Sequence, residues 1–131
     1  MTRLVFKSWC CLLYIDFRLN LRGFADLHRV VENTFARRPR DGNTAFPSRT
    51  LCQAVDLACV FYFKQVLCLQ HSAATTLLLR RHGWEAEMVI GAQIAPPKWH
   101  AWVEIKGVVV NDKPYMRDIY LVLNRCSSEV S

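Results

Sequence analysis

The sequence predicts an α+β fold, with helices in the amino-terminal part of the chain and a small antiparallel sheet toward the carboxyl end. Before Gly83, apolar residues recur at intervals of three and four residues, as on one face of a helix. After Gly83 the interval falls to two, which is typical of strands, and the next two predicted strands are separated only by Lys106 and Gly107. Helices followed by antiparallel strands indicate the α+β class rather than a doubly wound sheet.

The composition is that of one folded domain. Hydrophobic residues make up 52% of the 131 residues, and there are only five glycines and five prolines, which excludes disordered and collagen-like chains. We expect a single domain over residues 1–131, with a helical amino-terminal part over 1–40 and a core over 50–125. The net charge is +6, but the basic residues are scattered and not interleaved with aromatic residues. This pattern does not favour a nucleic-acid partner.

The cysteines indicate a reducing compartment. None of the six forms a C-x-x-C pair, so a zinc site is not predicted, and no secretory signal precedes them. The apolar run from Trp9 to Ile15 is far shorter than the roughly 20 residues that cross a membrane. We therefore expect a cytoplasmic protein without a membrane span, in which most cysteines are small buried side chains.

The first helical region covers residues 4–36. Its second half places apolar side chains at helical spacing, and Gly23 is expected to divide the region into two helices. Residues 37–48 concentrate proline, glycine, asparagine and aspartate, so they predict a loop.

Two further helices are predicted before the strands. Thr50 and Gln53 match a capping box, which predicts a buried helix from Thr50 to about Phe63. The next helix runs from Cys68 to His82, where basic residues in the last turn and the following Gly83 predict its end.

The remaining elements follow from alternation and from chain breakers. Residues 84–90 alternate as a strand, and residues 95–97 interrupt the chain with two prolines. Two more strands are predicted over residues 100–105 and 108–111. Apolar residues at helical spacing predict a closing helix over residues 115–126.

Three residues in these elements can supply the chemistry of a cysteine nucleophile. Cys68 begins a helix, where unpaired backbone N–H groups stabilise an anion and so favour the reactive thiolate. His100 begins a predicted strand, and Asp112 follows the next strand of the same hairpin. A thiolate, an imidazole that moves its proton and a carboxylate that orients the imidazole form a catalytic triad.

The loop between the two predicted strands decides whether His100 and Asp112 can meet. A tight loop of Lys106 and Gly107 would turn Asp112 to the opposite face from His100, because side chains alternate along a strand. A three-residue loop from Ile105 to Gly107, with Gly107 in a left-handed conformation, would place His100 opposite Asp112. We therefore predict the three-residue loop.

Four motifs surround the three residues. They are Cys68-Leu69-Gln70-His71-Ser72, the run from Leu78 to Ala86, Val89-Ile90-Gly91, and His100-Ala101-Trp102-Val103-Glu104 followed by Asn111-Asp112. Together they resemble, over residues 51–125, the transglutaminase-like cysteine peptidases that form the peptidase half of the B proteins of lasso-peptide biosynthesis. This sequence departs from the family at His71, where arginine is frequent, and at Trp99, where a small residue is common. Of the tryptophans beside His100, we expect one to pack on the sheet and the other to be exposed.

The resemblance implies a transglutaminase or papain-like core and a role for each residue. Cys68 would be the nucleophile, His100 the general base and acid, and Asp112 the orienting carboxylate. The implied activity is endopeptidase removal of the leader from a ribosomally made lasso-peptide precursor before macrolactam formation, with no metal or organic cofactor. Fused relatives carry a leader-binding domain that residues 4–36 do not resemble, so the implied partners are a PqqD-like leader-binding protein in trans and a macrolactam synthetase that acts next.

Two other readings stay open on sequence grounds. An acyl transferase of the transglutaminase type would use the same three residues and pass the acyl group to an amine instead of water. A non-enzymatic basic adaptor would hold Cys68 and His100 as ordinary core residues.

Overall fold

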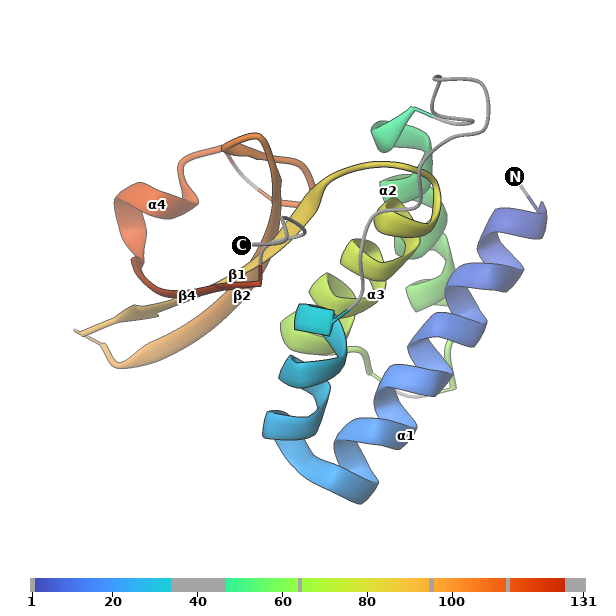
Figure 1. The fold of residues 1–131 in the computed structure, drawn as a ribbon, viewed down its shortest axis with the longest axis horizontal. Coiled ribbons are helices and arrows are strands. Elements are labelled where there is room, and N and C mark those ends of the chain that lie inside the picture. The colour runs from blue at the N-terminus through green and yellow to red at the C-terminus, as the bar shows by residue number, and fades with distance from the viewer. Residues whose placement is uncertain (1, 34–46, 64, 95, 113, 127–131) are drawn as a thin grey trace.

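The computed structural model describes residues 2–33, 47–63, 65–94, 96–112 and 114–126, and it has the expected α+β architecture (Figure 1). The helix α3 lies between the sheet on one side and the helices α1 and α2 on the other (Figure 1). In chain order the elements are α1 (Thr2–Asn33), α2 (Ser48–Val60), α3 (Cys68–Arg81), β1 (Ala86–Gln93), β2 (Lys98–Ile105), β3 (Val108–Val109), α4 (Met116–Ile119) and β4 (Leu121–Cys126).

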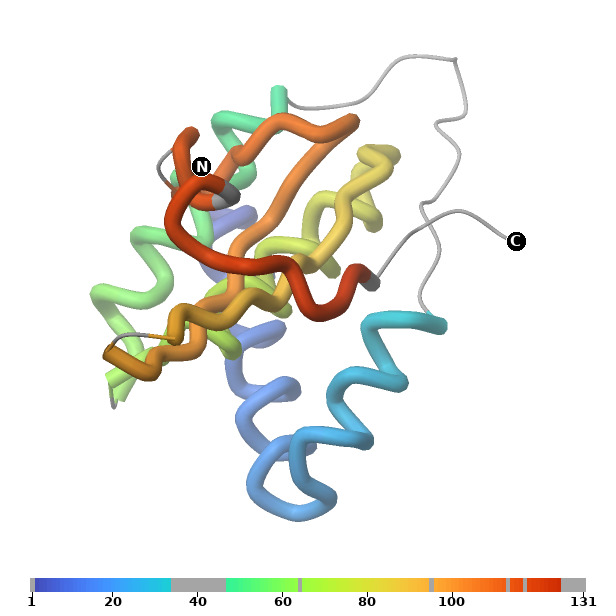
Figure 2. The backbone as a smooth tube through the Cα atoms, turned by 90° about the vertical axis from the view of Figure 1, so that its left-hand side faces the viewer, coloured from blue at the N-terminus to red at the C-terminus, as the bar shows by residue number. Residues whose placement is uncertain are grey.

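The helix α1 consists of two arms that meet at Gly23. The backbone of Gly23 is left-handed, with φ 82°, and Figures 1 and 2 show the two arms folded back in a V. The predicted division at this glycine is therefore confirmed. Each arm buries an apolar stripe, with Leu12 and Ile15 in the first and Leu27 and Val31 in the second.

The predicted loop over residues 37–48 falls almost entirely outside the described residues, and its last residue, Ser48, already begins α2. The predicted capping box is wrong. The carbonyl of Pro47 accepts hydrogen bonds from the N–H groups of Thr50 (3.1 Å) and Leu51 (3.3 Å), and no side chain caps the helix. The helix thus begins two residues before the predicted start, which places Thr50 inside its first turn, and it ends at Val60 rather than at Phe63.

The helix α3 begins at Cys68 and ends at Arg81, within one residue of the prediction, and the left-handed Gly83 follows it. Its residues from Ser72 to Arg80 are all buried, because helices cover one side and the sheet covers the other. Arg80 is fully buried and donates hydrogen bonds to the carbonyls of Val31 and Ala86. These bonds join the end of α3 to α1 and to β1.

The four strands form one antiparallel sheet in the order β3-β2-β1-β4. On β1 the side chains of Met88 and Ile90 pack with the helices, while Val89 packs with Trp102 on the other face. The alternation predicted for this strand is therefore confirmed, and the sheet has apolar contacts on both faces.

The predicted three-residue loop is wrong. Ile105 pairs with Val108, so the loop contains only Lys106 and Gly107, with φ 49° and 81°. Positive φ at both central residues is the geometry of a type I′ turn, whose twist matches that of the two strands.

The predicted closing helix is also wrong beyond its first turn. Only Met116–Ile119 is helical, and Leu121–Cys126 forms the strand β4, which pairs with β1 (Figure 2). Backbone hydrogen bonds to β1 outweigh the helical spacing of the apolar side chains, because an unpaired strand leaves donors and acceptors unsatisfied.

Gly91 on β1 lies where two aromatic residues approach the backbone. A Cβ atom on Gly91 would lie 2.8 Å from both Trp102 Cη2 and the Cβ of Tyr120. We expect Gly91→Ala to lower the free energy of unfolding by about 1–3 kcal/mol, because the aromatic residues and the strand must move apart. Urea unfolding followed by circular dichroism measures this loss, and a variant as stable as the wild type would contradict the close packing.

Candidate active site

Cys68 is the first residue of α3. Its side chain is partly buried, and its thiol is free, as are those of the four other cysteines whose side chains the structure describes. The first N–H groups of an α-helix have no partner within the helix and carry a partial positive charge. Cys68 therefore lies at the end of the helix where these N–H groups point.

Three other cysteines are poorly suited to act as nucleophiles. Burial, with a smaller contribution from the charge of Asp56, raises the pKa of Cys52 and of Cys59 to about 11. Burial also raises the pKa of Cys11. Because the thiolate is the reactive form, these thiols are held unreactive at neutral pH.

His100 and Asp112 lie in direct contact. The distance from His100 Nε2 to Asp112 Oδ2 is 2.5 Å, and both side chains are about three-quarters buried, with exposed fractions of 24% and 25%. A carboxylate at Nε2 favours the tautomer that carries its proton there and leaves Nδ1 as the acceptor.

Asp112 reaches His100 by a different path from the predicted one. The strand β3 ends at Val109, and the N–H of Val110 still donates to the carbonyl of Val103 (2.9 Å). At the next position a side chain replaces the backbone, since Asn111 Oδ1 accepts from the N–H of Val103 (2.7 Å). Asp112 therefore lies beyond the strand, and the alternation that would have turned it away from His100 does not apply.

The imidazole of His100 stacks with two aromatic neighbours, which also contact each other, on one face of the sheet. The ring centroids of Tyr120 and Trp102 lie 5.3 Å and 6.2 Å from that of His100, with interplanar angles of 19° and 25°. Trp102 is fully buried and donates from Nε1 to Glu104 Oε2 (2.7 Å), whereas Trp99 is 72% exposed. One tryptophan thus packs on the sheet and the other is exposed, as expected.

The buried carboxylate of Glu104 is itself compensated by a cation. Arg125 Nη1 on β4 lies 3.0 Å from Glu104 Oε1 and 3.2 Å from Glu87 Oε2. The contact with Glu104 joins β4 to β2. The carboxylate that accepts the hydrogen bond of Trp102 is therefore also paired with a guanidinium.

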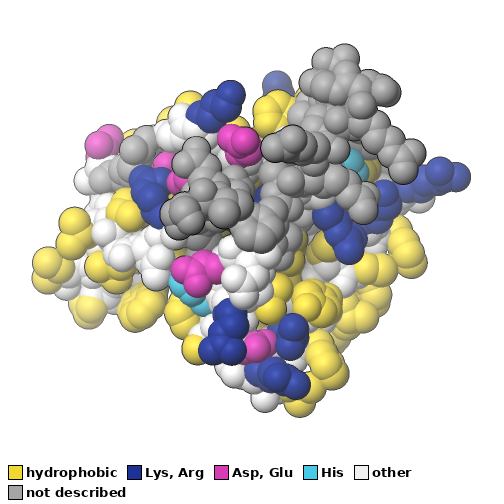
Figure 3. Space-filling view, viewed as in Figure 1, with side chains coloured by type: hydrophobic (Ala, Val, Ile, Leu, Met, Phe, Trp, Pro, Cys, Tyr) yellow, Lys and Arg dark blue, Asp and Glu magenta, His cyan; other side chains and the backbone are white. Residues whose placement is uncertain are grey.

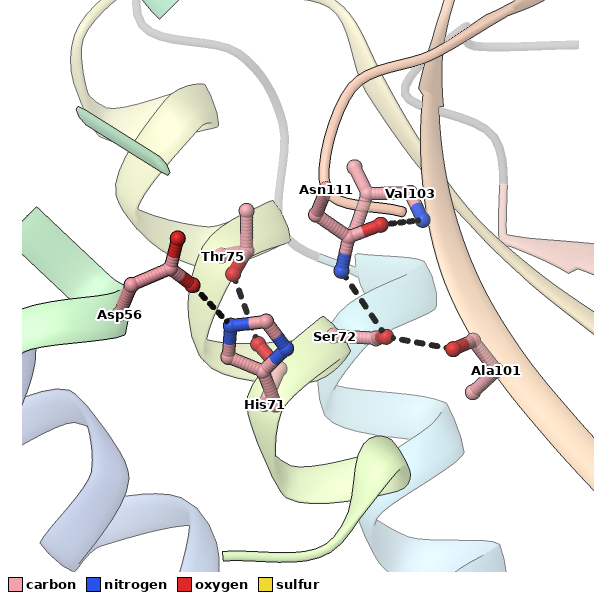
Figure 4. Close-up of polar contacts among 7 residues, drawn as sticks. All are labelled: Asp56, His71, Ser72, Thr75, Ala101, Val103 and Asn111. Atoms are coloured by element: carbon pink, nitrogen blue, oxygen red, sulfur yellow. Dashed lines mark hydrogen bonds and ion pairs between the residues drawn. The ribbon is translucent and has the colours of Figure 1, made fainter. Parts of the chain in front are cut away.

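Ser72 joins α3, the helix that begins at Cys68, to the strand that carries His100. Its hydroxyl donates to the carbonyl of Ala101 (2.9 Å) and accepts from Asn111 Nδ2 (3.3 Å), as Figure 4 shows. Cys68 is one helical turn before Ser72, and His100 directly precedes Ala101, so the start of α3 and the start of β2 lie at the same end of the fold. Within the described residues no hydrogen bond joins Cys68 to His100 or Asp112, and the His100 ring lies on the sheet face that carries Trp102, away from α3.

A family model described as the transglutaminase-like superfamily matches residues 11–125, which include all of these contacts. The chain belongs to the transglutaminase-like superfamily.

A curated relative narrows the comparison. The Microcin J25-processing protein McjB of Escherichia coli is 43% identical over 51 residues, which are 39% of this chain and 24% of McjB. The match thus covers about a quarter of the length of McjB. The resemblance named from the motifs is confirmed, and no solved structure matches the chain significantly.

At His71, where this transglutaminase-like chain departs from the lasso branch of the family, the structure shows a second imidazole–carboxylate pair. His71 Nε2 lies 2.8 Å from Asp56 Oδ1 on α2 (Figure 4). This pair joins α2 to the first turn of α3.

The described part of this transglutaminase-like chain contains no cluster of three or more histidine, cysteine or acidic side chains that would hold a metal ion. Nor does it contain a helix that combines the length and apolar character needed to cross a membrane.

Sequence reasoning missed the contact of Tyr120 with His100 and the contacts of Asn111 and Ser72 with the strand that carries His100. Tyr120 had been assigned to a closing helix, and only the pairing of β4 with β1 brings it to His100. Asn111 and Ser72 were quoted in the motifs, but their contacts depend on how the chain leaves β3.

Proposed function

We propose that this transglutaminase-like protein is a cysteine endopeptidase that removes the leader from a ribosomally made lasso-peptide precursor. Cys68 is the nucleophile, His100 the general base and acid, and Asp112 the carboxylate that orients the imidazole. The observation that carries the proposal is the 2.5 Å contact between His100 Nε2 and Asp112 Oδ2 at the end of the fold where α3 begins.

The reaction has two steps. His100 Nδ1 takes the proton of the Cys68 thiol, and the thiolate attacks the scissile carbonyl carbon. The C–N bond then breaks as Nδ1–H gives this proton to the departing amine, which leaves a thioester. His100 Nδ1 next takes a proton from water, the hydroxide attacks the thioester, and the C–S bond breaks to release the carboxylic acid as Nδ1–H returns its proton to the thiolate. The backbone N–H of Cys68 is the expected donor to the oxyanion of both steps.

We expect the hydrogen bond between the Cys68 thiol and the His100 imidazole to form when substrate is bound. Catalytic hydrogen bonds are frequently long or poorly aligned before substrate binds, and they tighten in the complex. His100 Nδ1 is the atom that must turn to Cys68, because Nε2 is already held by Asp112.

An extended peptide substrate fits the surface beside the site. Exposed apolar side chains gather over the end of the β1–β2 hairpin (Figure 3), where Trp99 is 72% and Ile94 is 85% exposed. Trp99 directly precedes His100 on β2, and by alternation its side chain lies on the face of the strand that carries Ala101, so apolar side chains of a bound peptide would contact it on the α3 side of the sheet.

The McjB match supports a precursor peptide as the substrate, since that relative is a peptide-processing protein by name. We further propose a PqqD-like leader-binding protein in trans and a macrolactam synthetase that acts on the product. We also propose a cytoplasmic location, because a reducing compartment keeps the thiols of the chain free.

Membership of the transglutaminase-like superfamily favours one second candidate, transfer of the acyl group to an amine. The thioester is common to both reactions, and only the attacking nucleophile differs. Mass spectrometry of the products separates them, because hydrolysis splits the peptide while amine transfer joins or modifies it.

Iodoacetamide tests the nucleophile without a substrate. We expect Cys68 to be alkylated about tenfold faster than Cys10, although Cys68 is partly buried and Cys10 is exposed, because His100 can accept the thiol proton as Cys68 attacks the reagent. Peptide mapping by mass spectrometry compares the two cysteines in the same sample. His100→Ala should remove the advantage. If Cys68 reacts more slowly than Cys10, it is an ordinary partly buried residue, and the adaptor interpretation replaces the peptidase.

A further inference from the structure

The Asn111 side chain lies between α3 and the β2–β3 hairpin. Its Oδ1 accepts from the N–H of Val103 on β2 (2.7 Å), and its Nδ2 donates to the Ser72 hydroxyl on α3 (3.3 Å). Figure 4 shows the amide lying between the strand and the helix, with one end turned to each. The side chain therefore bridges the elements that carry His100 and Cys68.

The position of Asp112 depends on this bridge. Backbone pairing between β2 and β3 ends at Val109, so pairing does not set the direction of the chain at Asp112. The last backbone hydrogen bond to β2 before Asp112 comes from Val110, and the Asn111 amide supplies the next contact. The carboxylate that contacts His100 thus directly follows a residue held at both ends of its amide.

The Ser72 hydroxyl completes the link. It is fully buried and donates to the carbonyl of Ala101, the residue after His100, while it accepts from Asn111. A buried hydroxyl that both donates and accepts fixes the orientation of its neighbours, because an unpaired polar group there would be costly.

We propose that Asn111 is a positioning residue that holds the Asp112 carboxylate against His100 Nε2 and keeps this pair in register with the start of α3. The inference rests on the proposed function, since it assigns Asn111 to the same site. Asn111 acts through Asp112 and touches neither the thiol nor the substrate.

The first test follows the His100 ring itself. In the wild type we expect ¹⁵N NMR to show the imidazole held in the Nε2–H tautomer, because Asp112 accepts that proton. Asn111→Ala should produce a mixture of tautomers, and so should Asp112→Asn. Asn124→Ala is the matched control, since Asn124 is an exposed asparagine of β4, and it should leave the ring signals unchanged.

The second test measures the coupling between Asn111 and Asp112. Its readout is the rate at which iodoacetamide alkylates Cys68. Asn111→Ala should lower the rate about 10- to 100-fold, since a displacement of about 1 Å in a reacting group costs this much. If Asn111 acts through Asp112, the double variant Asn111→Ala/Asp112→Asn should be no slower than Asp112→Asn alone, whereas independent effects would multiply.

The outcomes separate this inference from the proposed function. A folded Asn111→Ala variant that keeps the wild-type tautomer overturns the positioning role, whatever the reactivity of Cys68. Multiplying effects in the double variant overturn it as well and assign Asn111 a general structural role. If Cys68 proves unreactive while the tautomer is lost in Asn111→Ala, the positioning inference stands and the peptidase proposal fails.

Discussion

Cys68→Ala is expected to abolish cleavage of the precursor, with a loss of at least about 10⁴-fold, because no other group can form the thioester. The fold should survive, since alanine has the higher helix propensity and Cys68 is only partly buried at the first position of α3. The assay is mass spectrometry of the precursor incubated with the protein and its leader-binding partner, and circular dichroism monitors the fold.

Cys10→Ala provides the matched control for this variant. Cys10 is an exposed thiol on α1, so its removal should leave both cleavage and stability near those of the wild type. Cys52→Ala tests a different effect, because Cys52 is buried in α2 and its loss should reduce stability while the folded fraction still cuts. Cleavage by folded Cys68→Ala at a comparable rate would refute the proposed mechanism.

His100→Ala is expected to match Cys68→Ala in lost activity, since a thioester cannot form efficiently when no acid protonates the departing amine. Asp112→Asn should lose less, about 10²- to 10⁴-fold, because the imidazole remains but its tautomer and charge are no longer stabilised. Initial rates of precursor cleavage measure both losses. An Asp112→Asn variant with wild-type activity would show that the 2.5 Å contact has no part in catalysis.

The helical half of the fold could be predicted because its signals are local. Cys68 and Gly83 bracket α3, and Gly23 divides α1, as their chain positions indicated. Pro47 is an exception within this half, since its carbonyl starts α2 earlier than the Thr50 side chain would.

The carboxyl-terminal half depended on contacts that no local pattern contains. Residues 121–126 have helical spacing but pair with β1, a strand some thirty residues earlier. Lys106 adopts a positive φ that lysine rarely favours, so the tight turn is not the one its residue type indicates, although only two residues separate the predicted strands. The sequence predicted the contact between His100 and Asp112 from regular backbone pairing of two strands. In the structure the Asn111 side chain, rather than a backbone carbonyl, accepts from the N–H of Val103 just before Asp112.

The spacing of these contacts along the chain has a consequence for folding order. His100 and Asp112 are 12 residues apart, while Ser72 and Ala101 are 29 apart. The entropic cost of closing a loop rises with its length, and hairpins form within about 1–10 µs, so the imidazole–carboxylate pair can assemble before α3 docks. During synthesis the order is reversed, because Cys68 leaves the ribosome before either partner. On the proposed mechanism a nascent chain would therefore carry Cys68 without its base, and peptidase activity would arise only when the finished hairpin meets the helix.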